Sequence, residues 1–155
     1  MLEPGHKAPA LDLPTDDGGT VRLSDLRGAP VVIYFYPKDD TSGCTAEARD
    51  FSGLSDEFGE AGAHVIGVSP DDISSHQKFR KKHGLSVVLA SDEDRGVATA
   101  YAVWVEKSMY GRRYMGVERT TFLIDKTGKI ARIWRKVKVN GHAADVLAAV
   151  KSLGT

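Results

Sequence analysis

Residues 34–51, YFYPKDDTSGCTAEARDF, decide the fold of this chain. They overlap the apolar run at residues 31–36, VVIYFY, which is β-branched and aromatic throughout, as expected of a strand buried on both faces. A polar turn follows, and apolar residues then recur at helical spacing between residues 51 and 58. The stretch therefore predicts a buried strand that leads into a helix from about residue 43 to residue 61.

Strands and helices are predicted to alternate along the rest of the chain. Strands are expected at residues 21–23, 64–69, 87–90, 120–125 and 129–135, and helices at 69–84, 91–101 and 142–153. Strands joined by helices should be parallel, whereas the KTG turn before the last strand predicts an antiparallel hairpin. The fold class is therefore α/β, a thioredoxin-like fold with a mixed central β-sheet flanked by helices on both faces.

The composition is that of a single globular domain over residues 1–155, with 41% hydrophobic residues and a formal net charge of +0. Balanced charge favours neither nucleic acid nor a membrane surface as a partner. The basic segment at residues 78–84, KFRKKHG, lies in a helical pattern and reads as a solvated helix face. The N-terminal MLEPGHKAPA has no apolar run, so we expect no signal peptide and a cytoplasmic location.

Cys44, the only cysteine, follows the buried strand and falls in the first turn of the next helix. A lone cysteine is usually a small buried apolar residue. However, the carboxyl end of a strand is where α/β sheets present their sites, and a helix N-terminus stabilises the thiolate, the reactive form of the residue. One cysteine allows no internal disulfide, so the predicted chemistry is that of a single nucleophile.

A reactive thiolate at this position needs a second stabilising group. Keeping a thiol ionised below neutral pH takes roughly 3.4 kcal/mol, whereas a helix end contributes about 0.3–2 kcal/mol. An arginine that donates a charge-assisted hydrogen bond would add about 1.5–3 kcal/mol. Arg119, immediately before the apolar strand TTFLID, is the candidate, and Arg112 and Arg113 are alternatives.

Three residues near Cys44 are further site candidates. Thr41, three positions earlier, has a hydroxyl that can bond an oxygen substrate, although it can also serve simply as a helix cap. Pro37 ends the strand and can shield the thiol from water. Gly43 permits close approach of the backbone to a small ligand, so it is a predicted substrate-binding position.

The pattern Pro37-x-x-x-Thr41-x-x-Cys44 resembles the active-site signature of peroxiredoxins. The longer segments YFYPKDDTSGCTAEA and GVERTTFLID are similar to the bacterioferritin comigratory protein, or peroxiredoxin Q, branch of this family. The similarity extends from about Gly5 to the last helix, which is nearly the whole chain. The resemblance implies a thiol-dependent peroxidase that reduces hydrogen peroxide and organic hydroperoxides for antioxidant defence. It implies Cys44 as the peroxidatic cysteine, with Thr41 and Arg119 holding the peroxide and Pro37 shielding the thiol. Glu47 is expected in the substrate-binding site as a supporting hydrogen-bonding residue.

The chain departs from the common pattern of this branch at Arg49, where many members have a resolving cysteine. Oxidised Cys44 is therefore expected to react with an external thiol, either a thioredoxin-like protein or a small thiol. This gives a single-cysteine variant of a thioredoxin-dependent peroxiredoxin, expected to be a monomer or weak homodimer. No cofactor is expected, and no metal, because the histidines show no ligand spacing.

Two other functions remain possible from the sequence. A thiol–disulfide oxidoreductase would need C-x-x-C, whereas Thr45, Ala46 and Glu47 follow Cys44. A redox sensor or holdase would use oxidised Cys44 as a switch without turnover. The segment at residues 108–116, SMYGRRYMG, carries aromatic and sulfur side chains, and the sequence leaves open a rim of the active site, a partner contact or a plain hairpin or Ω-loop.

Overall fold

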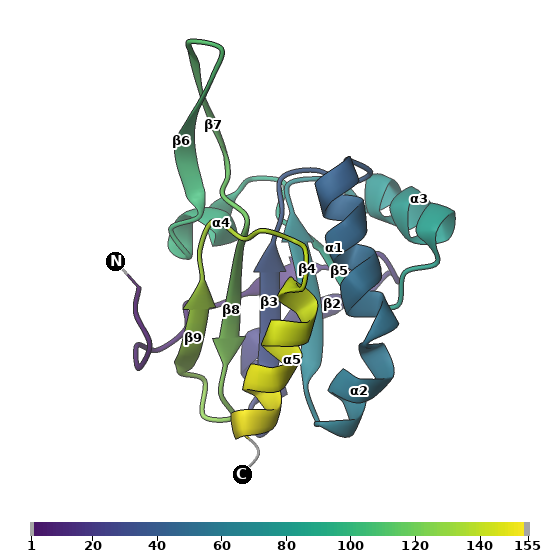
Figure 1. The fold of residues 1–155 in the computed structure, drawn as a ribbon, viewed down its shortest axis with the longest axis vertical. Helices are drawn as coiled ribbons and strands as arrows, with labels where there is room; N and C mark the ends of the chain where they lie inside the picture. Colours follow the sequence, from purple (N-terminus) through teal and green to yellow (C-terminus); the bar gives the residue numbers. More distant parts are fainter. Residues whose placement is uncertain (1, 154–155) are drawn as a thin grey trace.

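A five-stranded mixed sheet forms the centre of the computed structural model, which describes residues 2–153. Its strands are β3 (Val31–Phe35), β4 (His64–Ser69), β5 (Val88–Ser91), β8 (Thr120–Ile124) and β9 (Ile130–Trp134). They lie in the order β5-β4-β3-β8-β9 (Figure 1). The pairs β3–β4 and β4–β5 are parallel, whereas β8 is antiparallel to both β3 and β9. The predicted mixed sheet is thus confirmed, including the hairpin at the KTG turn.

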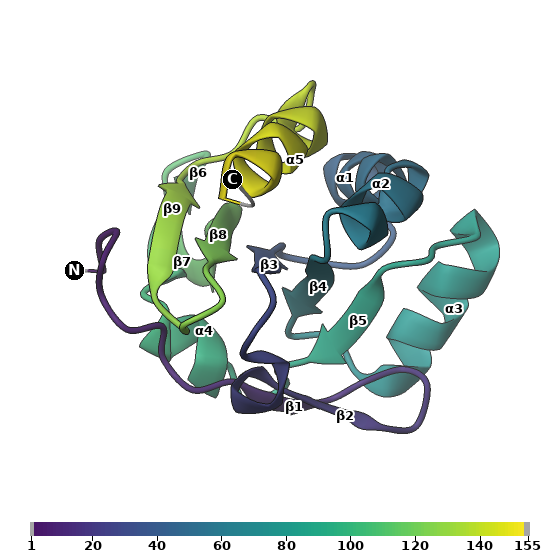
Figure 2. The same ribbon diagram turned by 90° about the horizontal axis from the view of Figure 1, so that it is seen from below.

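Helices pack on both faces of the sheet (Figure 2). One face is covered by α1 (Ser42–Gly53), α2 (Ser55–Glu60), α3 (Ile73–His83) and α5 (His142–Leu153). The other face carries the short helix α4 (Gly96–Ala100), the 3-10 turn η1 (Leu23–Leu26) and the N-terminal segment. The longest of these helices, α1 and α5, have 12 residues each, and within residues 2–153 no helix meets the length and hydropathy required to cross a bilayer.

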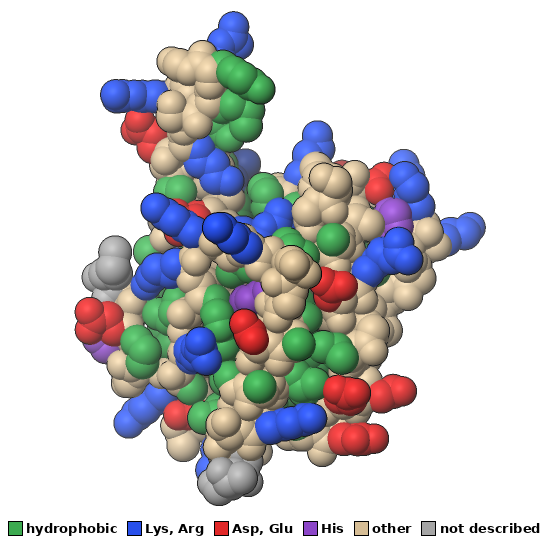
Figure 3. Space-filling view, viewed as in Figure 1, with side chains coloured by type: hydrophobic (Ala, Val, Ile, Leu, Met, Phe, Trp, Pro, Cys, Tyr) green, Lys and Arg blue, Asp and Glu red, His purple; other side chains and the backbone are tan. Residues whose placement is uncertain are grey.

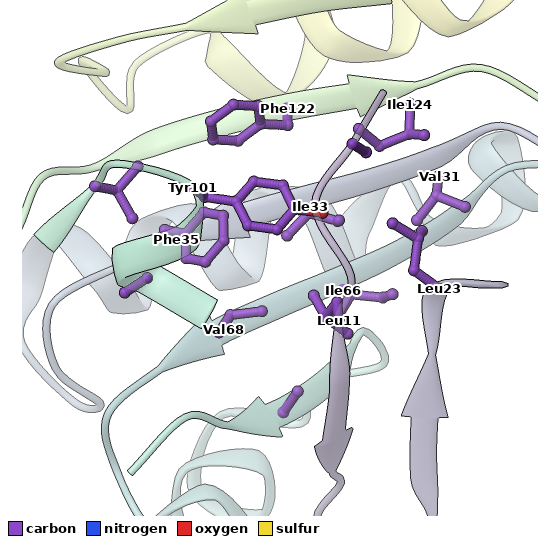
Figure 4. Packing of buried hydrophobic residues seen from close by; sticks show 14 of the residues in the cluster. Leu11, Leu23, Val31, Ile33, Phe35, Ile66, Val68, Tyr101, Phe122 and Ile124 are labelled. Atoms are coloured by element: carbon purple, nitrogen blue, oxygen red, sulfur yellow. The ribbon is translucent and has the colours of Figure 1, made fainter. Parts of the chain in front are cut away.

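Strand β3 is buried along its whole length and feeds two apolar cores. Val31, Ile33 and Phe35 point to the side of η1 and α4, where they pack with Tyr101 and Phe122 (Figure 4). Their neighbours in β3 point to the opposite core, under α1, α3 and α5. Full burial of one such side chain contributes about 1.5–3 kcal/mol, so β3 holds both layers together and fixes where its carboxyl end lies.

The helix after β3 is interrupted, which corrects the single helix predicted to residue 61. Helix α1 ends at Gly53, and α2 begins at Ser55 after Leu54 leaves helical geometry at φ −103° and ψ 9°. Glycine is a poor helix former, so the helix gives way there at little cost. The break lets Phe51 in α1 and Phe58 in α2 both be buried in the core shared with α5.

Two other helices begin later than predicted. Helix α3 begins at Ile73 with Asp72 as its cap, because the Asp72 carboxylate accepts a 2.8 Å hydrogen bond from the Ser75 N–H. The expected capping residue Ser69 is instead the last residue of β4. Helix α4 begins at Gly96 rather than near Ser91.

The structure contains two small sheets beside the central one. β1 (Asp12–Pro14), which was not predicted, pairs with β2 (Thr20–Arg22), and β6 (Trp104–Met109) pairs with β7 (Arg112–Val117). The segment at residues 108–116 is therefore a hairpin, one of the two forms that its sequence allowed. Figure 1 shows this hairpin projecting beyond the body at the end of the molecule where β3 runs into α1.

Candidate active site

The topology brings Cys44 and Arg119 to the same end of the sheet. Cys44 lies in the first turn of α1, directly after the carboxyl end of β3. Because β8 runs antiparallel to β3, Phe35 at the end of β3 pairs with Thr120 at the start of β8. Arg119 immediately precedes Thr120, and its carbonyl accepts a 3.0 Å hydrogen bond from the Val137 N–H, which helps to fix its backbone.

Arg119 donates hydrogen bonds to two residues of α1. Its Nη2 lies 3.2 Å from Cys44 Sγ, and its Nη1 donates to Glu47 Oε1 at 2.7 Å. Burial lowers the pKa of Arg119, but the negative charges of Glu47 and of a Cys44 thiolate outweigh it and raise the pKa above its ordinary value. The guanidinium therefore stays charged beside Cys44, a residue that is only 1% exposed.

Glu47 lies one helical turn after Cys44 on the same face of α1 and is 1% exposed. Burial raises the pKa of Glu47 to about 7, although the charge and hydrogen bond of Arg119 oppose the rise. Its Oε2 is buried and has no hydrogen-bond partner among the described residues. A proton on Oε2 is therefore easily held near neutral pH, so this carboxyl can exist as the acid or the anion.

The N-terminus of α1 directs backbone donors toward the same place. The Thr45 N–H donates to the Thr41 carbonyl at 2.8 Å, which is the first hydrogen bond of the helix. The N–H groups of Gly43 and Cys44 precede it in the chain and have no acceptor within the helix. The Thr41 side chain accepts no hydrogen bond from them, and its hydroxyl donates to the Lys38 carbonyl at 3.0 Å. These N–H groups can therefore bond a small anion or oxygen ligand.

Gly43 allows Arg119 to reach the sulfur. A Cβ at position 43 would lie 3.1 Å from Arg119 Nη2, which is closer than ordinary van der Waals contact. Gly43 is the predicted position for close approach of a ligand, and the structure shows close approach of a protein cation there. Pro37 is half-buried in the loop between β3 and α1.

The loop between β3 and α1 is held on α3 by Asp39, which no sequence motif indicates. The buried Asp39 carboxylate accepts hydrogen bonds from Tyr36 at 2.6 Å, Ser75 at 2.8 Å and His76 at 2.7 Å. Its backbone N–H donates to Asp71 Oδ2 at 2.8 Å. In the sequence, only the closeness of Asp39 to Thr41, two residues later, connects it with the site.

Asp39, Asp71 and His76 also form the one group within residues 2–153 whose ligand atoms are close enough to share a metal ion. The same atoms are engaged in hydrogen bonds with neighbouring side chains, so the cluster is self-sufficient as a polar network. Burial lowers the pKa of His76, but the hydrogen bond and charge of Asp39 outweigh this and raise it. The network ties the active-site loop to α3.

The other predicted arginines lie away from the sulfur. Arg112 and Arg113 are both on β7 and exposed, and Arg113 pairs with Glu106 at 3.5 Å. A cation that the sequence analysis missed, Lys107 on β6, lies nearer the site. Burial and the charge of Arg119 lower the pKa of Lys107, and the charges of Glu118 and of a Cys44 thiolate oppose that effect.

Comparisons with known proteins define the family of the chain. The model of the AhpC/TSA family matches residues 4–133. The peroxiredoxin Bcp of Bacillus subtilis is 49% identical over 152 residues, covering 98% of this chain and 97% of the relative. A putative peroxiredoxin of Coxiella burnetii is 49% identical over 146 residues, covering 94% of this chain and 97% of the relative.

Solved structures agree with the sequence relatives. The bacterioferritin comigratory protein of Xanthomonas campestris, described for its alkyl peroxide reduction activity, superposes with a TM-score of 0.92 at 43% identity. The match covers 99% of this chain and 100% of that protein. The chain belongs to the AhpC/TSA family, in its bacterioferritin comigratory protein branch of peroxiredoxins. The predicted thioredoxin-like fold and thiol peroxidase class are thereby confirmed.

Proposed function

We propose that Cys44 is the peroxidatic cysteine of this thiol-dependent peroxidase and that an external thiol completes each cycle. The 3.2 Å hydrogen bond from Arg119 Nη2 to Cys44 Sγ is the observation that carries this proposal. The guanidinium and the α1 N-terminus both favour the thiolate, and the sulfur lies directly beside backbone donors that a peroxide oxygen could use. The substrates are hydrogen peroxide and organic hydroperoxides.

The first step transfers one oxygen atom to sulfur. The Cys44 thiolate attacks the terminal oxygen of R–O–OH, the O–O bond breaks, and the products are Cys44–SOH and RO⁻, which takes a proton and leaves as ROH. Arg119 and the Gly43 and Cys44 N–H groups stabilise the developing charge on the leaving oxygen, and the Thr41 hydroxyl adds to this once it turns from the Lys38 carbonyl to the substrate. Pro37 limits the access of water.

Glu47 acts through Arg119 in this scheme. It is buried and holds Nη1, which leaves Nη2 directed at the sulfur. Glu47 therefore orients the guanidinium and limits its motion, and we assign it a positioning role in place of direct substrate binding. Because the pKa of Glu47 is about 7, its protonation changes the net charge next to Cys44 near neutral pH.

The second step requires another molecule, because the chain has one cysteine. A reductant thiol attacks Cys44–SOH and releases water, which leaves a mixed disulfide, and a second thiol then releases Cys44 as the thiolate. A thioredoxin-like protein or a small thiol can supply both sulfurs. We place this cycle in the cytoplasm, where such thiols are kept reduced, and in a monomer or weak homodimer.

The redox-sensor or holdase alternative shares the first step and differs in turnover. The named relatives are peroxiredoxins, which favours the peroxidase. Continued peroxide consumption in the presence of excess dithiol distinguishes a peroxidase from a sensor, which would stop after one oxidation.

The proposal is tested by intact-protein mass after one equivalent of hydrogen peroxide, with and without a reagent that traps sulfenic acid. Wild-type protein should gain one oxygen within seconds, form the trapped adduct and return to its starting mass with dithiol. Cys44→Ser should gain nothing under the same conditions. A wild-type protein that stays unmodified at neutral pH would overturn the assignment of Cys44.

A further inference from the structure

The β6–β7 hairpin is unusually apolar for a projecting element. Among the residues that the structure describes, it holds most of the exposed large hydrophobic side chains: Met109 at 56%, Tyr110 at 98%, Tyr114 at 43% and Met115 at 50%. Figure 3 shows hydrophobic side chains gathered on one side of the hairpin, with Lys or Arg side chains beside them. Exposed aromatic and methionine side chains next to cations are typical of a protein-binding surface.

The two faces of the hairpin differ in what they carry. Directly paired residues of antiparallel strands share a face, so one face holds three pairs: Val105 with Gly116, Lys107 with Tyr114, and Met109 with Arg112. We call this the site-facing side. The opposite side carries the Glu106–Arg113 ion pair and Met115.

Lys107 shows which side faces the active site. A Cβ at Gly116 would lie 3.2 Å from Lys107 Cδ, so the lysine stem runs along β7 toward the body of the protein. Lys107 is half-buried between exposed neighbours. Strand β7 ends at Val117, two residues before Arg119, which bonds Cys44 Sγ, and the charges that act on Lys107 are those of Arg119, Glu118 and Cys44. The side that carries Lys107, Tyr114 and Arg112 therefore lies toward Arg119 and Cys44.

The partner that must reach Cys44 is a thiol. This step rests on the proposed function: Cys44–SOH has no second cysteine in the chain, so a sulfur must come from outside. Cys44 is 1% exposed at the end of the sheet from which the hairpin projects. A protein that delivers a thiol there comes into contact with the site-facing side of the hairpin.

We propose that the site-facing side of the β6–β7 hairpin is the docking surface for a protein dithiol whose reactive sulfur lies in an apolar surface with acidic groups beyond it. Met109 and Tyr114 match the apolar part. Lys107 and Arg112 would form ion pairs with the acidic groups. Within residues 2–153 neither of them has an ion-pair partner, so both are free to bind an acidic partner, whereas Arg113 on the other side is paired with Glu106. The reductant thiol attacks Cys44–SOH to give a mixed disulfide and water, and its second thiol closes an internal disulfide and frees Cys44.

The test compares neighbouring residues on opposite sides of the hairpin. Turnover of hydrogen peroxide is measured with a bacterial thioredoxin, kept reduced by its reductase and NADPH, and separately with dithiothreitol. Arg112→Glu and Tyr114→Ser should each raise the KM for thioredoxin at least tenfold, and the Arg112→Glu effect should shrink at high salt. Arg113→Glu and Met115→Ser should change it less than twofold. All four variants should keep the wild-type rate with dithiothreitol.

The outcomes separate this proposal from the peroxidase assignment. No turnover of the wild type with either reductant would overturn the proposed function itself. Wild-type turnover with dithiothreitol but not with thioredoxin, or equal KM values for variants of both sides, would overturn the docking surface alone. A wild-type homodimer in sedimentation that Tyr114→Ser dissociates would also overturn it, because a second copy of the chain would then occupy this side.

Discussion

Arg119 Nη2 lies 3.2 Å from Cys44 Sγ, although the two residues are 75 positions apart in the sequence. The antiparallel pairing of β8 with β3 produces this contact, because it places the start of one strand beside the end of the other. Arg119 also holds Glu47 at 2.7 Å, so one side chain connects two residues of α1 to the sheet. The reactivity of the thiol therefore depends on the register of the central sheet.

Arg119→Ala should slow the oxidation of Cys44 by hydrogen peroxide. A charge-assisted hydrogen bond is worth about 1.5–3 kcal/mol, which corresponds to a rate loss of about 10-fold to 150-fold. Stopped-flow oxidation of the reduced protein at pH 7 measures this. Arg113→Ala, whose side chain is exposed on the hairpin, is the control and should retain the wild-type rate. An unchanged rate in Arg119→Ala would show that the guanidinium does not assist the thiolate.

Gly43→Ala should lower activity without lowering stability. The new Cβ would lie 3.1 Å from Arg119 Nη2, so the guanidinium must shift away from the sulfur. Alanine is the better helix former by roughly 0.5–1 kcal/mol, so the free energy of unfolding should hold or rise. Gly53→Ala, where nothing lies within 4 Å of the added Cβ, should stabilise the helix and leave the oxidation rate unchanged. Equal oxidation rates for the two variants would contradict the steric argument.

Glu47→Gln should flatten the dependence of stability on pH. The pKa of Glu47 is about 7 in the folded protein and ordinarily 4.5, so the folded state favours the protonated acid. This contribution is fully present below pH 4.5 and is lost as pH rises through about 7, an effect of about 3 kcal/mol. Urea unfolding at pH 5 and pH 8 measures the difference. Exposed Glu60→Gln should follow the wild type, and a wild-type slope in Glu47→Gln would refute the assignment.

Much of this architecture could be predicted from local sequence. The VVIYFY run, the KTG turn and the apolar periodicity of residues 142–153 each specify their own element, so β3, the β8–β9 hairpin and α5 lie where the sequence places them. Helix boundaries were less predictable, because the residues around Ser69 and Ser91 offer several possible caps. Which one is used depends on tertiary partners such as Asp39, whose N–H is bonded to Asp71.

The site shows the same division between local and distant information. The position of Cys44 at a helix start follows from the sequence around it, and the energetic need for a cation indicated an arginine. The contact between Arg119 and the sulfur depends on strand pairing, which no local pattern encodes. Lys107 and His76 were missed for that reason: each reaches the active-site region only because a distant element folds beside it.

Asp39→Asn should destabilise the protein more at acid pH than at alkaline pH. His76 has a raised pKa because of Asp39, so the pair contributes stability that is fully present below about pH 6.5 and is lost as pH rises through the raised value. Loss of a buried charged partner costs about 3 kcal/mol, and most of it should appear in urea unfolding at pH 6. At pH 9 the deficit should be smaller.

The neighbouring Asp40 provides the control for this prediction. Its carboxylate is partly exposed and pairs with Lys82 and His83, each at 2.8 Å. Solvent screens such exposed ion pairs, so Asp40→Asn should cost little stability. Hydrogen exchange of residues 37–45 should accelerate in Asp39→Asn and stay close to wild type in Asp40→Asn. Equal exchange in the two variants would mean that Asp39 does not hold the active-site loop.

Arg49→Cys should give the chain an internal resolving thiol. Positions 44 and 49 are both in α1, where five residues span about 7.5 Å along the axis. A disulfide requires Cα atoms within about 7 Å, so the first turns of α1 must unwind before the bond can form. Arg49 is exposed, so the substitution itself disturbs no buried contact.

Peroxide treatment of Arg49→Cys should therefore yield a species two mass units below the reduced protein, from loss of two hydrogens. Excess peroxide should carry the wild type on to the sulfinic acid, whereas disulfide formation should protect the variant. The oxidation of Arg49→Cys should then have two phases. Fast oxygen transfer to Cys44 is followed by slower disulfide formation, which is limited by the unwinding of α1. A variant that accumulates sulfinic acid as fast as the wild type would show that α1 stays closed over oxidised Cys44, and that an external thiol must then react within the folded site.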